Sequence, residues 1–315
     1  MKKRQLGRSK LEAVPLAFGG NVFGWTIDEP TSFRLLDNFI DAGFDLIDTA
    51  DIYSTWVPGN TGGESETIIG RWMKEKGNRH DVIIATKVGL DMGPNQKGLS
   101  RKYIMEAVDD SLRRLQTDYI DLYQSHQDDP DTPLAETLTA FGDLVSQGKV
   151  RAIGASNYTG ERLAEALEVS ERLGLPRYET IQPHYNLYDR EPYEATIEPL
   201  CMEKELGVLP YYALASGFLT GKYRSEADLS KSPRGKDNQK FLNERGYRIL
   251  EALDEVAAEH DSTPAEVSIA WLASRPCISA PIASATNVEQ LNELIAATQL
   301  QLKPEAVERL NEASS

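Results

Sequence analysis

Four side chains of this sequence have types and spacing suited to carbonyl chemistry: Asp48, Tyr53, Lys87 and His126. Three of them end short apolar segments, and Tyr53 follows Asp48 by five positions. A free phenol has a pKa of about 10, and a nearby ammonium such as Lys87 favours the phenolate and lowers that pKa. A buried Lys87 needs a counter-ion, which Asp48 can supply. The set suits protonation of a carbonyl oxygen while hydride reaches its carbon, with His126 donating a hydrogen bond or helping to pass the proton.

The elements that must position these residues are short apolar strands that alternate with amphipathic helices. A β-hairpin is expected over 4–13, with its turn at 7–9. The expected strands cover 14–18, 44–48, 82–87, 119–126, 150–155, 179–182, 207–211 and 277–282. The expected helices cover 31–42, 66–75, 100–115, 133–146, 161–173, 193–206, 246–259, 264–274 and 288–297. A long polar stretch over 222–243 interrupts this rhythm.

Eight alternating strands predict either a closed barrel or a doubly wound open sheet. The count of eight favours the barrel, and so does the lack of a G-x-G-x-x-G turn after the first strand. We therefore predict an α/β fold, a (β/α)8 TIM barrel with an N-terminal β-hairpin and extra C-terminal helices, as a single domain over 1–315. In such a barrel the C-terminal ends of the strands form one mouth. Asp48, Lys87 and His126 would then face the same mouth, with Tyr53 in the loop above it.

Composition limits the partners of the chain. The 315 residues carry a formal net charge of −15, which disfavours nucleic acid as a partner. Any anionic ligand must be met by local basic groups or backbone amides. Cys201 and Cys277 form no C-x-x-C pair, so a reducing compartment is expected. Neither a signal peptide nor a membrane-spanning segment is expected. These observations predict a cytoplasmic protein. We expect it to be a monomer or a weak homo-oligomer.

Four motifs in order along the chain resemble those of the aldo-keto reductase family. The segment at 43–53 fits the pattern G-x-x-x-x-D-T-A-x-x-Y, and 63–66 fits the G-x-S-E element that follows it. The strands that end at Lys87 and His126 resemble the lysine and histidine strands of the family, and the resemblance covers essentially the whole chain. It implies that Tyr53 is the general acid, that Lys87 and Asp48 tune it, and that His126 orients the carbonyl.

The same resemblance implies a nicotinamide cofactor and residues that bind it. Ser156, Asn157 and Gln182 match positions that hydrogen-bond the nicotinamide carboxamide, and Tyr211 matches the aromatic residue that stacks on its ring. The loop at 214–222 resembles a strap over the pyrophosphate, because small residues there let backbone amides approach an anion. The full set of expected cofactor-binding residues is Asp48, Ser156, Asn157, Gln182, Tyr211, Leu214, Ser216, Gly217, Lys222, Ser284, Thr286 and Gln290.

The sequence departs from the family pattern at both phosphate sites. Ser284, Thr286 and Gln290 match positions around the adenosine ribose and its 2′-phosphate, yet 283–290 contains no basic residue. Leu294 stands where an adenine-contacting Asn is common. NADP(H) is expected by resemblance, with NAD(H) as the alternative, since hydroxyls and a helix N-terminus hold phosphate less strongly than an added guanidinium. The strap lacks the frequent Arg, and Arg234 in the polar stretch is the candidate replacement.

The expected substrate walls are aromatic, and they suit small apolar or aryl aldehydes, ketones or the corresponding alcohols. They comprise Trp25, Tyr53, Trp56, His126 and Tyr212. Each residue also has a structural explanation: Asp48 can cap a loop, Lys87 can lie on the surface, and the aromatic residues can cover core. Two other function classes remain open. One is a catalytically weak nucleotide-binding sensor or auxiliary subunit, which the intact quartet disfavours; the other is a metal-dependent barrel hydrolase or aldolase, disfavoured by the missing set of spaced ligands.

Overall fold

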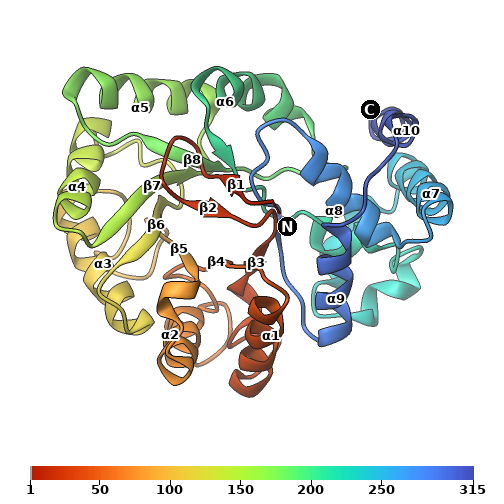
Figure 1. The fold of residues 1–315 in the computed structure, drawn as a ribbon, viewed down its shortest axis with the longest axis horizontal. Coiled ribbons are helices and arrows are strands. Elements are labelled where there is room, and N and C mark those ends of the chain that lie inside the picture. The colour runs from red at the N-terminus through yellow and green to blue at the C-terminus, as the bar shows by residue number, and fades with distance from the viewer. Residues whose placement is uncertain (1) are drawn as a thin grey trace.

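The computed structural model describes residues 2–315, and eight parallel strands form its central sheet. The strand order is β10-β3-β4-β5-β6-β7-β8-β9. Their bounds are β3 Ala17–Gly19, β4 Leu46–Asp48, β5 Ile83–Val88, β6 Ile120–Ser125, β7 Val150–Ser156, β8 Tyr178–Gln182, β9 Gly207–Val208 and β10 Ile282–Ala283. Figure 1 shows these strands in a curled arrangement with helices around its outside.

Ten α-helices surround the strands in the described part of the chain. They are α1 Glu29–Asp41, α2 Glu64–Lys76, α3 Arg101–Leu115, α4 Leu134–Ser146, α5 Gly160–Leu173, α6 Glu198–Lys204, α7 Glu244–Glu259, α8 Pro264–Ser274, α9 Val288–Ala297 and α10 Pro304–Ala313. Several begin with a side chain that caps the first turn, such as Ser100 before α3 and Thr159 before α5. Such caps satisfy amide groups that the helix leaves free, and they fix where each helix leaves its loop.

The sheet closes on itself through the segment just before β10. Val208 in β9 forms an isolated parallel bridge with Ile278, and its amide donates to the Cys277 carbonyl at 3.0 Å. On the other side, β10 pairs with β3 in parallel. The predicted (β/α)8 barrel is therefore confirmed.

The core has two layers, one inside the strands and one between strands and helices. The inner layer contains small and branched side chains from successive strands, including Ala17, Leu46 and Leu122. The hairpin of β1 Arg4–Gln5 and β2 Glu12–Ala13 adds Leu6 and Leu11 to this layer, and Figure 1 shows it lying across the strands. Its turn requires Gly7, because φ there is +64° and a Cβ would lie 2.1 Å from the Glu179 carbonyl oxygen.

Several observed elements differ from those expected, among them β3 and β9, which cover Ala17–Gly19 and Gly207–Val208 in place of 14–18 and 207–211. The expected last strand over 277–282 is a two-residue strand at β10, because the residues before it are held by irregular hydrogen bonds to β9. The polar stretch over 222–243 contains two 3-10 helices, Glu226–Lys231 and Gly235–Phe241. A further helix, α10, follows the expected last one and packs against α7. In the part of the chain that the structure describes, every helix is too short or too polar to cross a bilayer.

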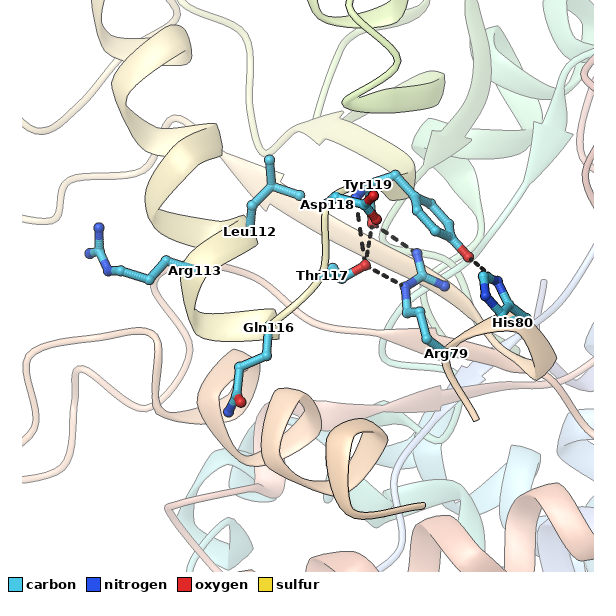
Figure 2. A pocket seen from close by; sticks show the side chains of 8 residues that line it. All are labelled: Arg79, His80, Leu112, Arg113, Gln116, Thr117, Asp118 and Tyr119. Carbon is cyan, nitrogen blue, oxygen red and sulfur yellow. Dashed lines mark hydrogen bonds between the residues drawn. The ribbon is translucent and has the colours of Figure 1, made fainter. Parts of the chain in front are cut away.

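A hollow of about 580 Å3 opens where β5 and β6 begin, at the end of the barrel away from Asp48 (Figure 2). Arg79 lies in it and donates to the Thr117 hydroxyl, the carbonyls of Val82 and Tyr119, and the Asp121 carboxylate. The Arg79 guanidinium also lies 3.8 Å from the centre of the Tyr119 ring. These contacts occupy the donors of Arg79 within the protein, so Arg79 stabilises the end of the barrel where β5 and β6 begin.

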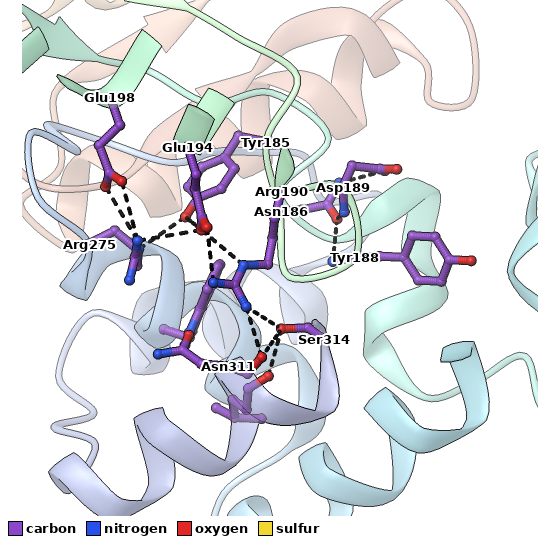
Figure 3. A network of polar contacts seen from close by, with 12 residues as sticks. Tyr185, Asn186, Tyr188, Asp189, Arg190, Glu194, Glu198, Arg275, Asn311 and Ser314 are labelled. Atoms are coloured by element: carbon purple, nitrogen blue, oxygen red, sulfur yellow. Dashed lines mark hydrogen bonds and ion pairs between the residues drawn. The ribbon is translucent and has the colours of Figure 1, made fainter. Parts of the chain in front are cut away.

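The C-terminal helix is attached to the barrel by Arg190, in the loop after β8 (Figure 3). Its guanidinium pairs with Glu194 at 2.9 and 3.0 Å, and donates to the Asn311 carbonyl at 2.9 Å and the Ser314 hydroxyl at 2.8 Å. Arg275 joins the same cluster through the Tyr185 hydroxyl at 3.0 Å. This network holds α10 against the loop that follows β8.

We expect Arg190→Met to lower the free energy of unfolding by about 1–3 kcal/mol, because charged hydrogen-bond partners lose their donor. The matched control is Arg309→Met, which removes exposed pairs with Glu255 and Glu259 and should cost less than about 1 kcal/mol. Urea unfolding measures both. Equal losses for the two variants would show that the Arg190 network contributes no more than a surface pair.

Candidate active site

Asp48, Tyr53 and Lys87 converge at the C-terminal ends of β4 and β5. The Lys87 ammonium donates to Asp48 Oδ2 at 2.8 Å, to the Thr49 carbonyl at 2.8 Å and to the Tyr53 hydroxyl at 2.9 Å. The Tyr53 hydroxyl lies 3.2 Å from the same Asp48 oxygen. The three groups form a compact triangle, which is the arrangement that their positions at strand ends predicted.

Burial dominates the electrostatics of this triangle. Lys87 is 0 % exposed and Asp48 is 1 % exposed. Burial lowers the pKa of Lys87, and the charge of Asp48 opposes that shift. Burial also raises the pKa of Tyr53 well above its usual value, and the Asp48 carboxylate raises it further. The expected lowering of the phenol pKa by Lys87 is therefore wrong for this structure, because loss of water around the phenol outweighs the nearby ammonium.

His126 lies at the same mouth, one residue after the end of β6. Its ring centre is 6.2 Å from that of Tyr53, in an edge-to-face arrangement. Burial lowers its pKa well below the usual value, and the charge of Lys87 acts in the same direction. The ring is therefore neutral at physiological pH, and a neutral imidazole can donate one hydrogen bond to a carbonyl oxygen.

Four residues expected to hold the nicotinamide lie in one hydrogen-bonded row that starts at Asp48. Gln182 Nε2 donates to Asp48 Oδ1 at 2.9 Å, and the Ser156 hydroxyl donates to the Gln182 carbonyl at 2.9 Å. Asn157 Nδ2 lies 3.1 Å from the Ser156 hydroxyl, and the Tyr211 hydroxyl donates to Asn157 Oδ1 at 2.7 Å. The row forms a polar edge with an aromatic ring at its end, which fits a planar ring that carries a carboxamide.

The strap expected over the pyrophosphate has an unusual backbone. Three consecutive residues, Ala215, Ser216 and Gly217, have positive φ angles of 47°, 56° and 94°. The Lys222 ammonium would lie 3.1 Å from a Cβ added to Gly217, so it sits directly against this backbone. Leu214 precedes this turn, and its carbonyl accepts a hydrogen bond from the Gly217 amide at 2.8 Å. An ammonium beside a tight backbone turn can hold a phosphate oxygen.

The residues expected around the adenosine ribose lie after β10. The Ser284 hydroxyl donates to the Gly19 carbonyl at 2.7 Å, so it ties the ends of β10 and β3 together. Gln290 Oε1 accepts from both the amide and the hydroxyl of Thr286, at 2.8 and 3.0 Å. A groove of about 530 Å3 adjoins the start of α9, and it is lined by Thr263, Glu266, Asn287, Glu289, Gln290, Asn292 and Glu293. Its lining includes three glutamates and no basic residue.

Aromatic side chains surround the mouth above Tyr53. The Trp56 ring centre lies 6.2 Å from that of Tyr53 and 5.4 Å from that of Trp25. Trp56 and Tyr212 are about half exposed, at 48 % and 47 %. The Arg234 guanidinium lies 4.9 Å from the centre of the Trp25 ring, which brings the polar stretch over the mouth. Of the expected substrate walls, Trp25, Tyr53, Trp56 and His126 are connected by ring contacts, and Tyr212 packs against Tyr211 and His184.

Three residues near the site were missed from the sequence. Asn21 lies 2.7 Å from the Ser284 hydroxyl, and the other side of its amide can accept from the Arg234 guanidinium. His184 stacks on Tyr211 with ring centres 5.4 Å apart. Gln124 Oε1 lies 3.4 Å from Gln182 Nε2. Gln124 lies in the histidine strand and His184 follows β8 by two residues, yet only tertiary packing reveals these contacts.

The sequence of this chain is similar to those of known proteins. Residues 15–315 match the model of the "Aldo/keto reductase family". A "Probable voltage-gated potassium channel subunit beta" from Oryza sativa subsp. japonica is 35% identical, with 98% of this chain and 95% of the relative aligned. The "Uncharacterized oxidoreductase YrpG" of Bacillus subtilis is 36% identical, with 99% of this chain and 95% of the relative aligned. The "Aldo-keto reductase YhdN" of the same organism is 36% identical, with 94% of this chain and 86% of the relative aligned. The chain therefore belongs to the aldo/keto reductase family.

Proposed function

We propose that the protein reduces aldehyde or ketone carbonyls to alcohols, or catalyses the reverse reaction, by hydride transfer from a nicotinamide cofactor. The observation that carries the proposal is the triangle of Asp48, Tyr53 and Lys87, in which Asp48 and Lys87 are buried and the Tyr53 hydroxyl lies 2.9 Å from the Lys87 ammonium. A phenol held by an ammonium at an open mouth is a positioned proton donor. Buried ionisable groups that meet in this way concentrate at functional sites.

In this proposal, each of the four residues has a separate task. Tyr53 donates its proton to the carbonyl oxygen as the alcohol forms. Lys87 donates to the Tyr53 hydroxyl and stabilises the negative charge that the departing proton leaves, while Asp48 keeps the buried ammonium charged. Neutral His126 donates to the carbonyl oxygen and orients it. The bound cofactor supplies the hydride, and the row from Gln182 to Tyr211 would hold its nicotinamide.

The family uses nicotinamide cofactors, and we propose NADP(H) as the preferred one, with NAD(H) as the alternative. Lys222 and Arg234 are the basic side chains available to the pyrophosphate. The 2′-phosphate would meet only the Thr286 hydroxyl and the start of α9, because the adjoining groove offers glutamates and no guanidinium. Leu294, where family members often have Asn, is buried and adds no polar contact.

We expect the KM for NADPH to be lower than that for NADH, by roughly tenfold or less, because a helix N-terminus contributes only about 1 kcal/mol to phosphate binding. Steady-state rates at a fixed carbonyl concentration, measured with each cofactor, give both constants. A lower KM for NADH would contradict the preference and make NAD(H) the cofactor of this protein.

The aromatic mouth supports small apolar or aryl carbonyl substrates. Trp25, Trp56 and Tyr212 offer flat surfaces, and the exposed fractions of Trp56 and Tyr212 leave those surfaces accessible. Both cysteines are free in the structure, which supports a reducing, cytoplasmic setting. We propose that the protein works there as a monomer or a weak homo-oligomer.

A nucleotide-binding sensor or auxiliary subunit is the second candidate, because one similar protein is named as a probable channel subunit. Turnover separates the two functions. NADPH consumption with 4-nitrobenzaldehyde, followed by absorbance, should be catalysed by the wild-type protein. If the protein binds NADPH tightly but reduces none of a panel of aldehydes and ketones, that result would favour the sensor and contradict the proposed activity.

A further inference from the structure

A second group of buried ionisable residues lies behind the active site, between α2, α3 and the strands. Asp51 is 2 % exposed and Glu66 is 0 % exposed. Glu66 accepts from Arg114 Nε at 2.6 Å and from the Thr86 hydroxyl at 2.6 Å, so both of its oxygens are satisfied. Neither oxygen of Asp51 has a hydrogen-bond partner, although the Ile52 amide lies close enough to influence it. Asp51 therefore differs from every other carboxyl group at the site.

The charges around Asp51 do not balance if all the acids are ionised. Three carboxyl groups, those of Asp48, Asp51 and Glu66, share two cations. Lys87 is bound to Asp48 at 2.8 Å and Arg114 to Glu66 at 2.6 Å. An unpaired, desolvated carboxylate is far more costly than a protonated one. Asp51 is thus the group that keeps a proton.

The electrostatic surroundings of Asp51 lead to the same assignment. Burial and the Glu66 carboxylate raise the pKa of Asp51 to about 8, while Arg114 and Lys87 oppose the shift. The titratable or charged groups that face it are Glu66 on α2, Tyr103 and Arg114 on α3, Lys87 on β5 and Tyr123 on β6. The Tyr123 hydroxyl is also buried without a partner.

Asp51 is connected to the active site through the backbone as well as through its charge. Its amide donates to the Lys87 carbonyl at 3.3 Å, and it lies two residues before Tyr53 in the same loop. A change of charge on Asp51 therefore acts on Lys87 through a dry interior, where electrostatic interactions are strong.

We propose that Asp51 is a positioning residue that must stay a neutral carboxylic acid for catalysis, and that its ionisation at alkaline pH slows the reaction by adding an unpaired negative charge beside Lys87. This inference rests on the proposed carbonyl reductase function. The added charge holds the Lys87 ammonium more tightly protonated and opposes a second negative charge on Tyr53. Tyr53 then becomes a weaker acid for carbonyl reduction, and its phenolate becomes harder to form for alcohol oxidation.

The test compares wild type with Asp51→Asn, which keeps the shape of the side chain and cannot ionise. We expect the kcat of the wild type to fall as the pH rises through about 8. The kcat of Asp51→Asn should stay constant until the pH is at least about one unit above the pH at which the wild-type kcat falls. Asp45→Asn is the matched control on the same segment, because Asp45 is also buried but is paired with Lys3; it should keep the wild-type profile. An unchanged alkaline limb in Asp51→Asn would overturn the proposal and assign that limb to another group, such as Lys87.

Two further readouts do not depend on turnover. Difference infrared spectroscopy should show a protonated carboxylic acid band that disappears as the pH rises through about 8 and is absent in Asp51→Asn. Because the folded-state pKa is raised, the stability that this proton provides is complete below about pH 3.9 and is lost as the pH rises through the folded value. The melting temperature of wild type should therefore fall with pH over this range more steeply than that of Asp51→Asn.

These readouts separate the failure of this inference from a failure of the proposed function. If the protein turns over no carbonyl but shows the infrared band and the pH dependence of stability, Asp51 is neutral and the proposed activity is absent. The positioning role of Asp51 is then rejected. If Asp51→Asn does not fold, Asp51→Leu supplies an uncharged side chain of similar size for the same comparisons. Absence of the acid band in wild type near neutral pH would overturn the inference on its own.

Discussion

Replacing Tyr53 with Phe should lower kcat with NADPH and 4-nitrobenzaldehyde by about 10²–10⁴-fold, which is the usual contribution of a positioned general acid. The hydroxyl that this change removes is the one that lies 2.9 Å from the Lys87 ammonium and 3.2 Å from Asp48. The ring remains, and with it the contacts to Trp56 and His126. The loss should therefore fall on kcat, with little change in NADPH affinity measured by fluorescence titration.

The control for this result is Tyr247→Phe, which removes an exposed phenol on α7. It should leave kcat unchanged within about twofold, since surface substitutions rarely matter to function or stability. Equal rates for Tyr53→Phe and wild type would remove Tyr53 from its assigned role. Loss of NADPH binding in Tyr53→Phe would instead show that the hydroxyl serves the cofactor.

Replacing Arg114 with Met should lower the free energy of unfolding by about 3–5 kcal/mol, because it leaves a buried charge without its partner. Glu66 is 0 % exposed and receives the Arg114 Nε hydrogen bond at 2.6 Å. The unpaired Glu66 would also lie near the carboxyl group of Asp51. Denaturant unfolding followed by circular dichroism measures the effect.

The adjacent Arg113 provides a matched control on the same helix. Its ion pair with Asp110 is exposed, with side-chain exposures of 71% and 45%, so Arg113→Met should cost less than about 1 kcal/mol. Adding Glu66→Gln to Arg114→Met should restore part of the lost stability, because the uncompensated charge is then gone. Similar losses for Arg113→Met and Arg114→Met would contradict a structural role for the buried pair.

The barrel and the convergence of Asp48, Tyr53 and Lys87 were predictable because both depend on local patterns. Apolar strands that end in Asp48, Lys87 and His126 place those side chains at one mouth in any closed barrel. The missed helix α10 also had a local signal, since Pro304 occupies its first turn and Leu310 is buried on one face. The expected strand over 277–282 failed because its pairing to β9 depends on the irregular geometry that closes the barrel.

The sequence could not predict features that depend on burial or on contacts between residues far apart in the chain. Asp51 and Glu66 are fifteen positions apart, and their isolation from water depends on α3, which supplies Arg114 from 48 positions after Glu66. The direction of the Tyr53 pKa depends on how much water reaches the phenol, which no motif encodes. The contact of Arg234 with Trp25 arises because the polar stretch folds back over the mouth.

In the reaction that we propose, hydride passes between a nicotinamide and a carbonyl at the mouth formed by Asp48, Tyr53, Lys87 and His126. A direct test uses NADPH with deuterium at both C4 positions of the nicotinamide, 4-nitrobenzaldehyde as acceptor, and mass spectrometry of the product. We expect the wild type to form 4-nitrobenzyl alcohol that carries one transferred deuterium at its benzylic carbon, and Tyr53→Phe to form almost none. Alcohol without deuterium, or no alcohol from a protein that binds NADPH, would contradict it.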